Sequence, residues 1–123
     1  MVWKFTGDKP VYQQIMEHIR GAILVGAYPP GARIPPVRDL AAEAKVNPNT
    51  MQRALVELER EGLLISCGTI GRFVTDDPGI LQDMKNKVID ATIRASATQF
   101  RGLGLSMEQA AGMLLALDKE AGL

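Results

Sequence analysis

The stretch that decides the fold runs from Pro10 to Val74. It includes 34-IPPVRDLA-41, 46-VNPNTM-51 and 58-LEREGLL-64. The whole stretch predicts one helix, a tight turn, a helix-turn-helix and a β-hairpin, in that order, which is the plan of a winged helix-turn-helix. We therefore expect a mostly α-helical fold with a small β-hairpin wing, and this order of elements favours a transcription regulator over an enzyme.

The first part of this stretch carries an apolar stripe. Apolar side chains recur every three or four residues between Tyr12 and Ile23, which predicts a helix over residues 11–25. Gly26 can end this helix in a left-handed conformation, and the prolines that follow prevent its continuation. We expect a short second helix from about Pro36 to just before Val46.

Asn47 and Pro48 give the sharpest local signal. Asn is a favoured N-cap and Pro is favoured at the first helical position, so a third helix should begin here. At its N-terminal end the exposed face would carry four polar side chains. These are Asn49, Thr50, Gln52 and Arg53. A recognition helix carries base-reading side chains at this place, although the same residues also suit capping and an ordinary helix surface.

A glycine-rich hairpin should follow the third helix. Two β-prone runs, residues 63–66 and 72–75, are joined by residues 67–71. We expect the tip, with Gly68, Thr69 and Gly71, to lie against the minor groove or the DNA backbone, because glycine permits a close approach. Arg72 is predicted to reach a phosphate.

The distribution of charge matters more than its sum. The 123 residues have a formal net charge of zero, which by itself disfavours binding to a polyanion. However, several basic residues lie in segments that should converge on one surface. They are Arg33, Arg38, Lys45, Arg53 and Arg72, whereas the glutamates at positions 57, 59 and 61 should lie at the far end of a helix. We therefore expect a local basic face.

Residues 77–123 should form a separate C-terminal region after a winged domain of residues 1–76. Residues 76–79 break the chain, and apolar spacing then predicts a helix over residues 80–100. Ser106 and Gln109 have the spacing of a capping box, so a second helix should follow and end near Ala121. Two helices cannot bury so much apolar surface alone, and we expect them to form a homodimer. The expected dimerisation residues are Leu81, Met84, Val88, Ala91, Ala95, Met107, Leu114 and Leu117.

Other classes of protein find little support. No run is long and apolar enough for a membrane span, and the N-terminus lacks the layout of a signal peptide, so a cytoplasmic location is expected. Cys67 and His18 cannot build a structural zinc site alone, and no metal or other cofactor is expected. His18 should be an ordinary helix-surface residue. Oxidation of Cys67 stays open as a minor means of control.

These residues resemble the GntR superfamily of bacterial regulators over residues 9–75. The most specific pieces are 12-YQQI-15, 30-PGARIP-35, 37-VRDLA-41, 47-NPNT-50 and residues 55–63. The resemblance implies a dimer on a palindromic operator, with Arg38 and the start of the third helix touching DNA. The NPNT motif and the short C-terminal region are similar to the YtrA-like branch, which implies control of the regulator's own operon and of a neighbouring transporter operon.

Two functional classes therefore stand beside each other. The leading one is a sequence-specific homodimeric repressor that binds double-stranded operator DNA. The alternative is a winged-helix module that binds a protein partner and does not bind DNA specifically. Two modes of control stay open for the repressor. A small-molecule effector could bind between the two helices of the C-terminal region, or protein concentration alone could set the level of binding.

Overall fold

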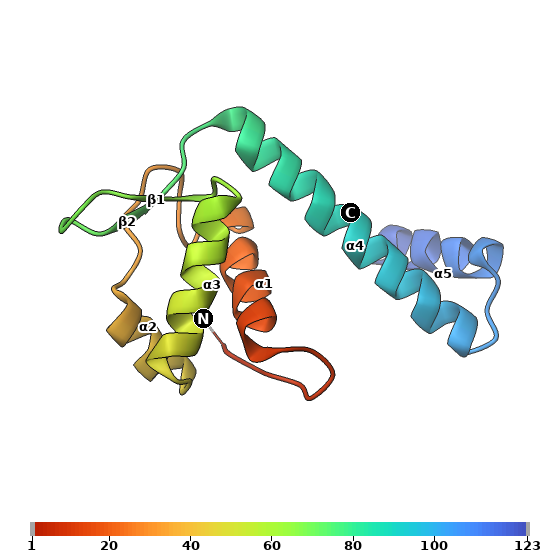
Figure 1. Ribbon diagram of the computed structural model, residues 1–123. Coiled ribbons are helices and arrows are strands. Elements are labelled where there is room, and N and C mark those ends of the chain that lie inside the picture. Colours follow the sequence, from red (N-terminus) through yellow and green to blue (C-terminus); the bar gives the residue numbers. More distant parts are fainter. Residues whose placement is uncertain (1, 123) are drawn as a thin grey trace. The chain divides into compact units, whose positions relative to one another are not determined.

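The computed structural model describes residues 2–122, which form five helices and one two-stranded hairpin (Figure 1). The elements are α1 (Val11–Leu24), α2 (Val37–Ala44), α3 (Pro48–Arg60), β1 (Leu64–Ser66), β2 (Arg72–Val74), α4 (Pro78–Gly102) and α5 (Met107–Glu120). This architecture confirms the predicted mostly helical fold with a hairpin wing. The chain divides into two compact units, residues 1–85 and 86–123, and α4 runs from the first into the second.

The core of the first unit lies between its three helices. Figure 1 shows α1 and α3 side by side, and α2 packs against α3. The apolar stripe of α1 is buried, as its spacing predicts, with Ile15 and Ile19 fully inaccessible. From α2 and α3 the fully buried side chains include Leu40, Met51 and Leu58. Burial of these stripes fixes which face of α3 stays exposed.

The turn between α2 and α3 combines two local devices. Lys45 ends α2 in the left-handed conformation with φ of 57°, a region that residues with a side chain rarely adopt. Two residues later, the side-chain oxygen of Asn47 accepts a hydrogen bond of 2.8 Å from the backbone N–H of Asn49. Pro48 occupies the first turn of α3. The predicted start of the third helix is thus confirmed.

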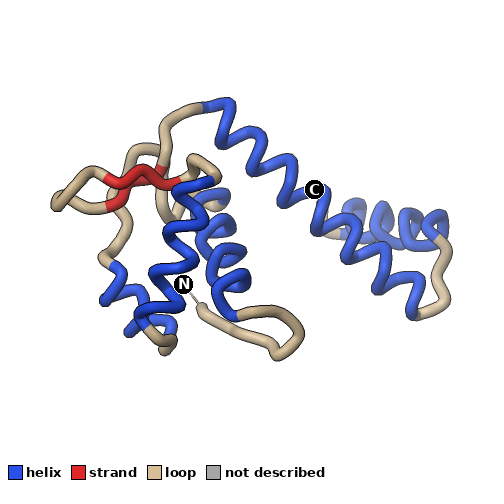
Figure 2. The backbone as a smooth tube through the Cα atoms, viewed as in Figure 1, coloured by secondary structure: helices blue, strands red, loops and turns tan. Residues whose placement is uncertain are grey.

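The hairpin is attached to the first unit through a third backbone segment. β1 and β2 are antiparallel, with Leu64 opposite Val74, and Figure 2 shows the pair in red. The N–H of Ile34 donates to the carbonyl of Arg72 at 3.0 Å, and the N–H of Val74 donates to the carbonyl of Ala32 at 2.8 Å. The segment before α2 therefore runs along β2 and restrains the wing.

An N-terminal arm, residues 2–9, packs on α1. The backbone N–H of Thr6 donates to the side-chain oxygen of Gln14 at 2.8 Å, and the amide of Gln14 donates to the carbonyls of Thr6 and Lys9, each at 2.8 Å. The His18 ring lies 5.0 Å from the Trp3 ring and 5.7 Å from the Phe5 ring, centroid to centroid. The expectation that His18 is an ordinary helix-surface residue is therefore wrong, because aromatic contacts hold it.

The second unit contains the part of α4 from Asn86 onward and the whole of α5. The capping box predicted for α5 is present: the N–H of Ser106 donates to the side chain of Gln109 at 2.9 Å, and the N–H of Gln109 donates to the Ser106 hydroxyl at 3.0 Å. Ala110 is buried, but many larger apolar side chains of both helices are exposed. No helix formed by residues 2–122 is both long and apolar enough to cross a lipid bilayer.

Candidate nucleic-acid interface

The N-terminal half of α3 presents a polar exposed face. Asn49, Gln52 and Arg53 are exposed and Thr50 is half-buried, while Met51 and Ala54 point into the core. The structure thus places the four predicted base-reading residues on or at the edge of the solvent face. Amide, hydroxyl and guanidinium groups at this position match the donors and acceptors of base edges in the major groove.

Arg53 is held by an aromatic ring of α1. Its guanidinium carbon lies 3.8 Å from the centroid of the Tyr12 ring, which is close enough for a cation–π interaction. The side chain of Gln13 donates to the Tyr12 hydroxyl at 3.3 Å. Because the ring fixes the direction of the guanidinium and leaves the residue exposed, Arg53 is oriented before any ligand arrives. Spacing along the sequence could not reveal this contact between residues 41 positions apart.

The two ends of α2 carry the next pair of predicted cations. Arg38 is exposed in the first turn of α2, and Lys45 is exposed at its C-terminal cap. Asn47 is exposed as well, but its side-chain oxygen is occupied by the N–H of Asn49. Its amide group is therefore the part of the side chain with which it could donate to a ligand.

The wing has a tight, uncharged tip. The N–H of Cys67 donates to the carbonyl of Gly71 at 2.8 Å, and the N–H of Ile70 donates to the carbonyl of Cys67 at 3.0 Å. Gly68 and Thr69 are exposed at this turn, and Ile70 is exposed too. Ile70 was not predicted as a site residue, and its side chain is 63% exposed.

Arg33 and Gly71, both predicted DNA-binding residues, lie against each other. Gly71 has φ of 130°, and a Cβ at this position would lie only 2.9 Å from Nε of Arg33. The absence of a side chain at Gly71 therefore lets the Arg33 guanidinium pack against the base of the wing. The structure brings these two predicted residues together.

Arg72 has an ion-pair partner that the sequence did not predict. Its Nε donates to the carboxylate of Glu59, and the two side chains are only 18% and 26% exposed. The sequence placed Glu59 away from the basic face, but the hairpin folds back over the end of α3 and meets it. Arg72 is thus paired with an internal partner, and its contact with a phosphate stays a prediction.

The predicted dimerisation residues fall into two groups. Met84 is only 5% exposed, and Leu81 and Val88 are half-buried. Met84 lies one helical turn beyond Ile80, whose side chain fills the space beside Gly62, so the start of α4 belongs to the first unit. We therefore leave Met84 out of the predicted dimer surface. The exposed members are Ala91, Ala95, Met107, Leu114 and Leu117.

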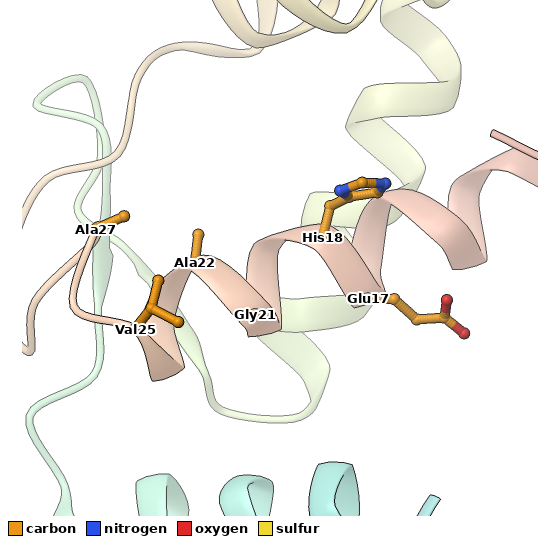
Figure 3. Close-up of a pocket in the computed structure, with 6 residues that line it drawn as sticks. All are labelled: Glu17, His18, Gly21, Ala22, Val25 and Ala27. Carbon is orange, nitrogen blue, oxygen red and sulfur yellow. The ribbon is translucent and has the colours of Figure 1, made fainter. Parts of the chain in front are cut away.

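A shallow hollow lies along the outer side of α1, as Figure 3 shows. It is lined by Glu17, His18, Gly21, Ala22, Val25 and Ala27. The side chains of Glu17 and His18 extend in different directions, and the Glu17 carboxylate pairs with Nζ of Lys9 at 2.7 Å. The hollow thus brings no set of chemical groups together, and we assign it no function.

A winged helix-turn-helix with a polar recognition face defines a class of transcription regulators. The model of the bacterial regulatory proteins of the gntR family matches residues 11–74. The chain therefore belongs to the GntR family, whose members are regulators and not enzymes.

Curated relatives place the chain within this family. It is 33% identical over 106 residues to YhcF, an uncharacterised helix-turn-helix transcriptional regulator of Bacillus subtilis, with 86% of this chain and 88% of that protein covered. It is also 33% identical over 92 residues to the transcriptional repressor YtrA of the same organism, with 67% and 71% covered. These relatives support its place in the YtrA-like branch, as the sequence predicted.

Solved structures show the same fold. A GntR family transcriptional regulator from Listeria monocytogenes superposes with a TM-score of 0.80 at 28% identity, covering 91% of this chain and 98% of that one. The DNA-binding domain of AraR, solved in complex with operator ORX1, gives a TM-score of 0.57 at 30% identity, covering 61% of this chain and 96% of that one.

Proposed function

We propose that this regulator is a homodimeric repressor that binds a palindromic operator. In this proposal α3 enters the major groove, the wing tip lies along the flanking minor groove or backbone, and the C-terminal helices hold two copies at the spacing of two half-sites. The observation that carries the proposal is the exposed polar face at the N-terminal end of α3. Such a face on a domain of this fold suits contact with DNA, and the similar AraR domain was solved with its operator.

The side chains of this face support sequence reading rather than general attraction to phosphate. Asn49 and Gln52 can each form paired hydrogen bonds with an adenine edge, and arginine pairs best with guanine. Arg53 is already oriented by Tyr12, so less conformational freedom is lost when it binds. Arg38 in the first turn of α2 is the natural candidate for contact with the backbone or an adjacent base.

The exposed apolar residues of the second unit support a dimer. Ile93, Leu114 and Leu117 are 64%, 52% and 59% exposed, and large apolar side chains gathered in a two-helix unit favour burial against a partner. A second copy of the same unit is the simplest partner. Its two-fold symmetry would match a palindromic site, in which each half-site meets one winged domain.

The proposal extends to how this regulator acts and is controlled. The relative YtrA is named a repressor, which favours repression over activation. We propose control of the regulator's own operon and of a neighbouring transporter operon, as the resemblance to this branch implies. A small-molecule effector bound by α4 and α5 could alter the spacing of the two winged domains. Control by protein concentration alone would need no effector.

A salt-series binding titration tests the central proposal. The purified protein is titrated against its own upstream promoter DNA and against a scrambled duplex, with the mass measured by light scattering. We expect a dimer that prefers the promoter, with affinity that falls steeply as salt rises. Equal, weak and salt-insensitive binding to both duplexes would instead support the alternative function, a winged-helix module that binds a protein partner.

The variant Leu117→Glu tests the dimer. A charge within the apolar surface should shift the mass toward that of a monomer and weaken operator binding, because two linked half-sites bind more tightly than one. Ala116→Glu is the matched control, since it adds the same charge at the neighbouring exposed position of α5. If both variants stay dimeric, Leu117 lies outside the interface.

A further inference from the structure

The ion pair between Arg72 and Glu59 joins the wing to the recognition helix. Arg72 is the first residue of β2 and Glu59 is the second-to-last residue of α3. Side chains alternate along a strand, so Arg72 leaves the hairpin on the same face as Val74, which is buried. The guanidinium therefore extends under the hairpin toward α3 rather than outward into solvent.

The base of the wing is also restrained by the segment before α2. Arg33 packs against Gly71, the residue that precedes Arg72 in the sequence. The carbonyl of Arg72 accepts a hydrogen bond of 3.0 Å from the N–H of Ile34. Beyond these contacts the tip, residues 67–70, carries no charged side chain. The wing thus has an uncharged tip on a base that contacts both α3 and the segment before α2.

The Arg72–Glu59 pair is largely shielded from solvent. This shielding disfavours a change in which Arg72 leaves Glu59 and contacts a DNA phosphate instead. If Arg72 moved to a DNA phosphate, the carboxylate of Glu59 would be left largely covered and without its cation. Loss of one partner from a shielded pair is costly because the remaining charge is not fully hydrated. The unpaired carboxylate would also repel the nearby phosphates.

We propose that Arg72 is a positioning residue and that its pair with Glu59 persists in the DNA complex. The pair sets the place of the uncharged tip relative to α3, so that wing and recognition helix read the duplex as one rigid unit. This inference rests on the proposed function. It removes Arg72 from the phosphate contacts and makes Glu59, an acidic residue, a determinant of operator specificity.

The experiment compares full-length wild-type protein with Arg72→Gln, Glu59→Gln and the exchanged pair Glu59→Arg/Arg72→Glu. Arg60→Gln is the matched control, because Arg60 is exposed and pairs with Glu57 at 2.6 Å within α3. Each protein is titrated with promoter and scrambled duplex at several salt concentrations. Amide hydrogen exchange at residues 67–71 is followed in the absence of DNA, and melting curves establish that each variant folds.

If Arg72 positions the wing, both single variants should reduce the preference for the promoter by about tenfold, within the range of coupled contacting residues. In Arg72→Gln the dependence of log affinity on log salt should keep its slope, since no phosphate contact is lost. Amide exchange in the wing should become faster, and the exchanged pair should recover most of both effects. Arg60→Gln should change neither readout.

A direct phosphate contact would give the opposite pattern. Arg72→Gln would then lower the salt slope by about 0.9; this result overturns the inference and leaves the proposed function intact. Wild-type protein without a preference for the promoter would overturn the proposed function instead. Unchanged wing exchange in both single variants would overturn the positioning role whatever the DNA titrations give.

Discussion

Replacement of Asn47 by alanine should lower the free energy of unfolding by about 1 kcal/mol. The Asn47 side chain caps α3 through its 2.8 Å hydrogen bond with the N–H of Asn49, and alanine has no acceptor there. α3 contributes the central buried side chains of the first unit, so fraying of its first turn disturbs the core. A loss of this size corresponds to about 4–8 °C in Tm for a domain of 60–100 residues.

Asn47→Asp separates the cap from DNA binding. Aspartate keeps the acceptor and adds a negative charge at a helix N-terminus, where the helix dipole favours it. Stability should therefore stay within about 0.5 kcal/mol of the wild-type value, as for a surface substitution. Operator affinity should nevertheless fall more than in Asn47→Ala, because the new charge faces the phosphates.

Urea unfolding followed by circular dichroism, together with promoter titrations, measures both effects. If Asn47→Ala is as stable as wild-type protein, the cap contributes nothing to stability. If Asn47→Asp binds the promoter as tightly as wild-type protein, Asn47 lies away from the DNA.

Three further predictions follow from single positions. Arg38→Ala should weaken operator binding by roughly 1–3 kcal/mol with the dimer intact, and unchanged affinity would remove Arg38 from the interface. Lys45→Gly should raise the free energy of unfolding by up to about 1 kcal/mol, since glycine accepts the left-handed conformation; a decrease in urea unfolding would contradict this. Burial, and then the charge of Glu43, raise the pKa of Tyr28 above its usual value of 10.0, so folding favours the protonated phenol and stability should decline as the pH rises above 10. Glu43→Gln should lower the pKa of Tyr28 in a tyrosinate absorbance titration, and an unchanged titration would exclude that charge.

The parts of the fold with a local cause could be predicted from the sequence. Asn47 with Pro48, and Ser106 with Gln109, mark helix starts through contacts within three residues, and both starts are confirmed. Asp77 with Pro78 carries the same kind of signal as Asn47 with Pro48. The Asp77 side chain accepts from the N–H of Gly79 at 2.9 Å. We interpreted this segment as a chain break and therefore expected the helix to begin at residue 80. The structure shows that α4 begins two residues earlier, at Pro78.

The parts of the site with a long-range cause could not be predicted. Arg53 meets Tyr12 only because α1 packs beside α3, and Arg72 meets Glu59 only because the hairpin returns over the end of α3. Neither contact leaves a periodic pattern in the sequence. Residue type predicted which side chains are cationic, but the fold decides which of them already have a partner.

The N-terminal arm has a practical consequence for anyone who wishes to isolate the winged domain. The family match begins at residue 11, so a fragment cut by sequence similarity would start there. Such a fragment would lose the hydrogen bonds that join the Gln14 side chain to Thr6 and Lys9 and would expose this side chain to solvent. It would also uncover the His18 ring by removing Trp3 and Phe5. An isolated domain should therefore include the arm, and an affinity tag next to residue 2 needs a linker long enough to leave these contacts undisturbed.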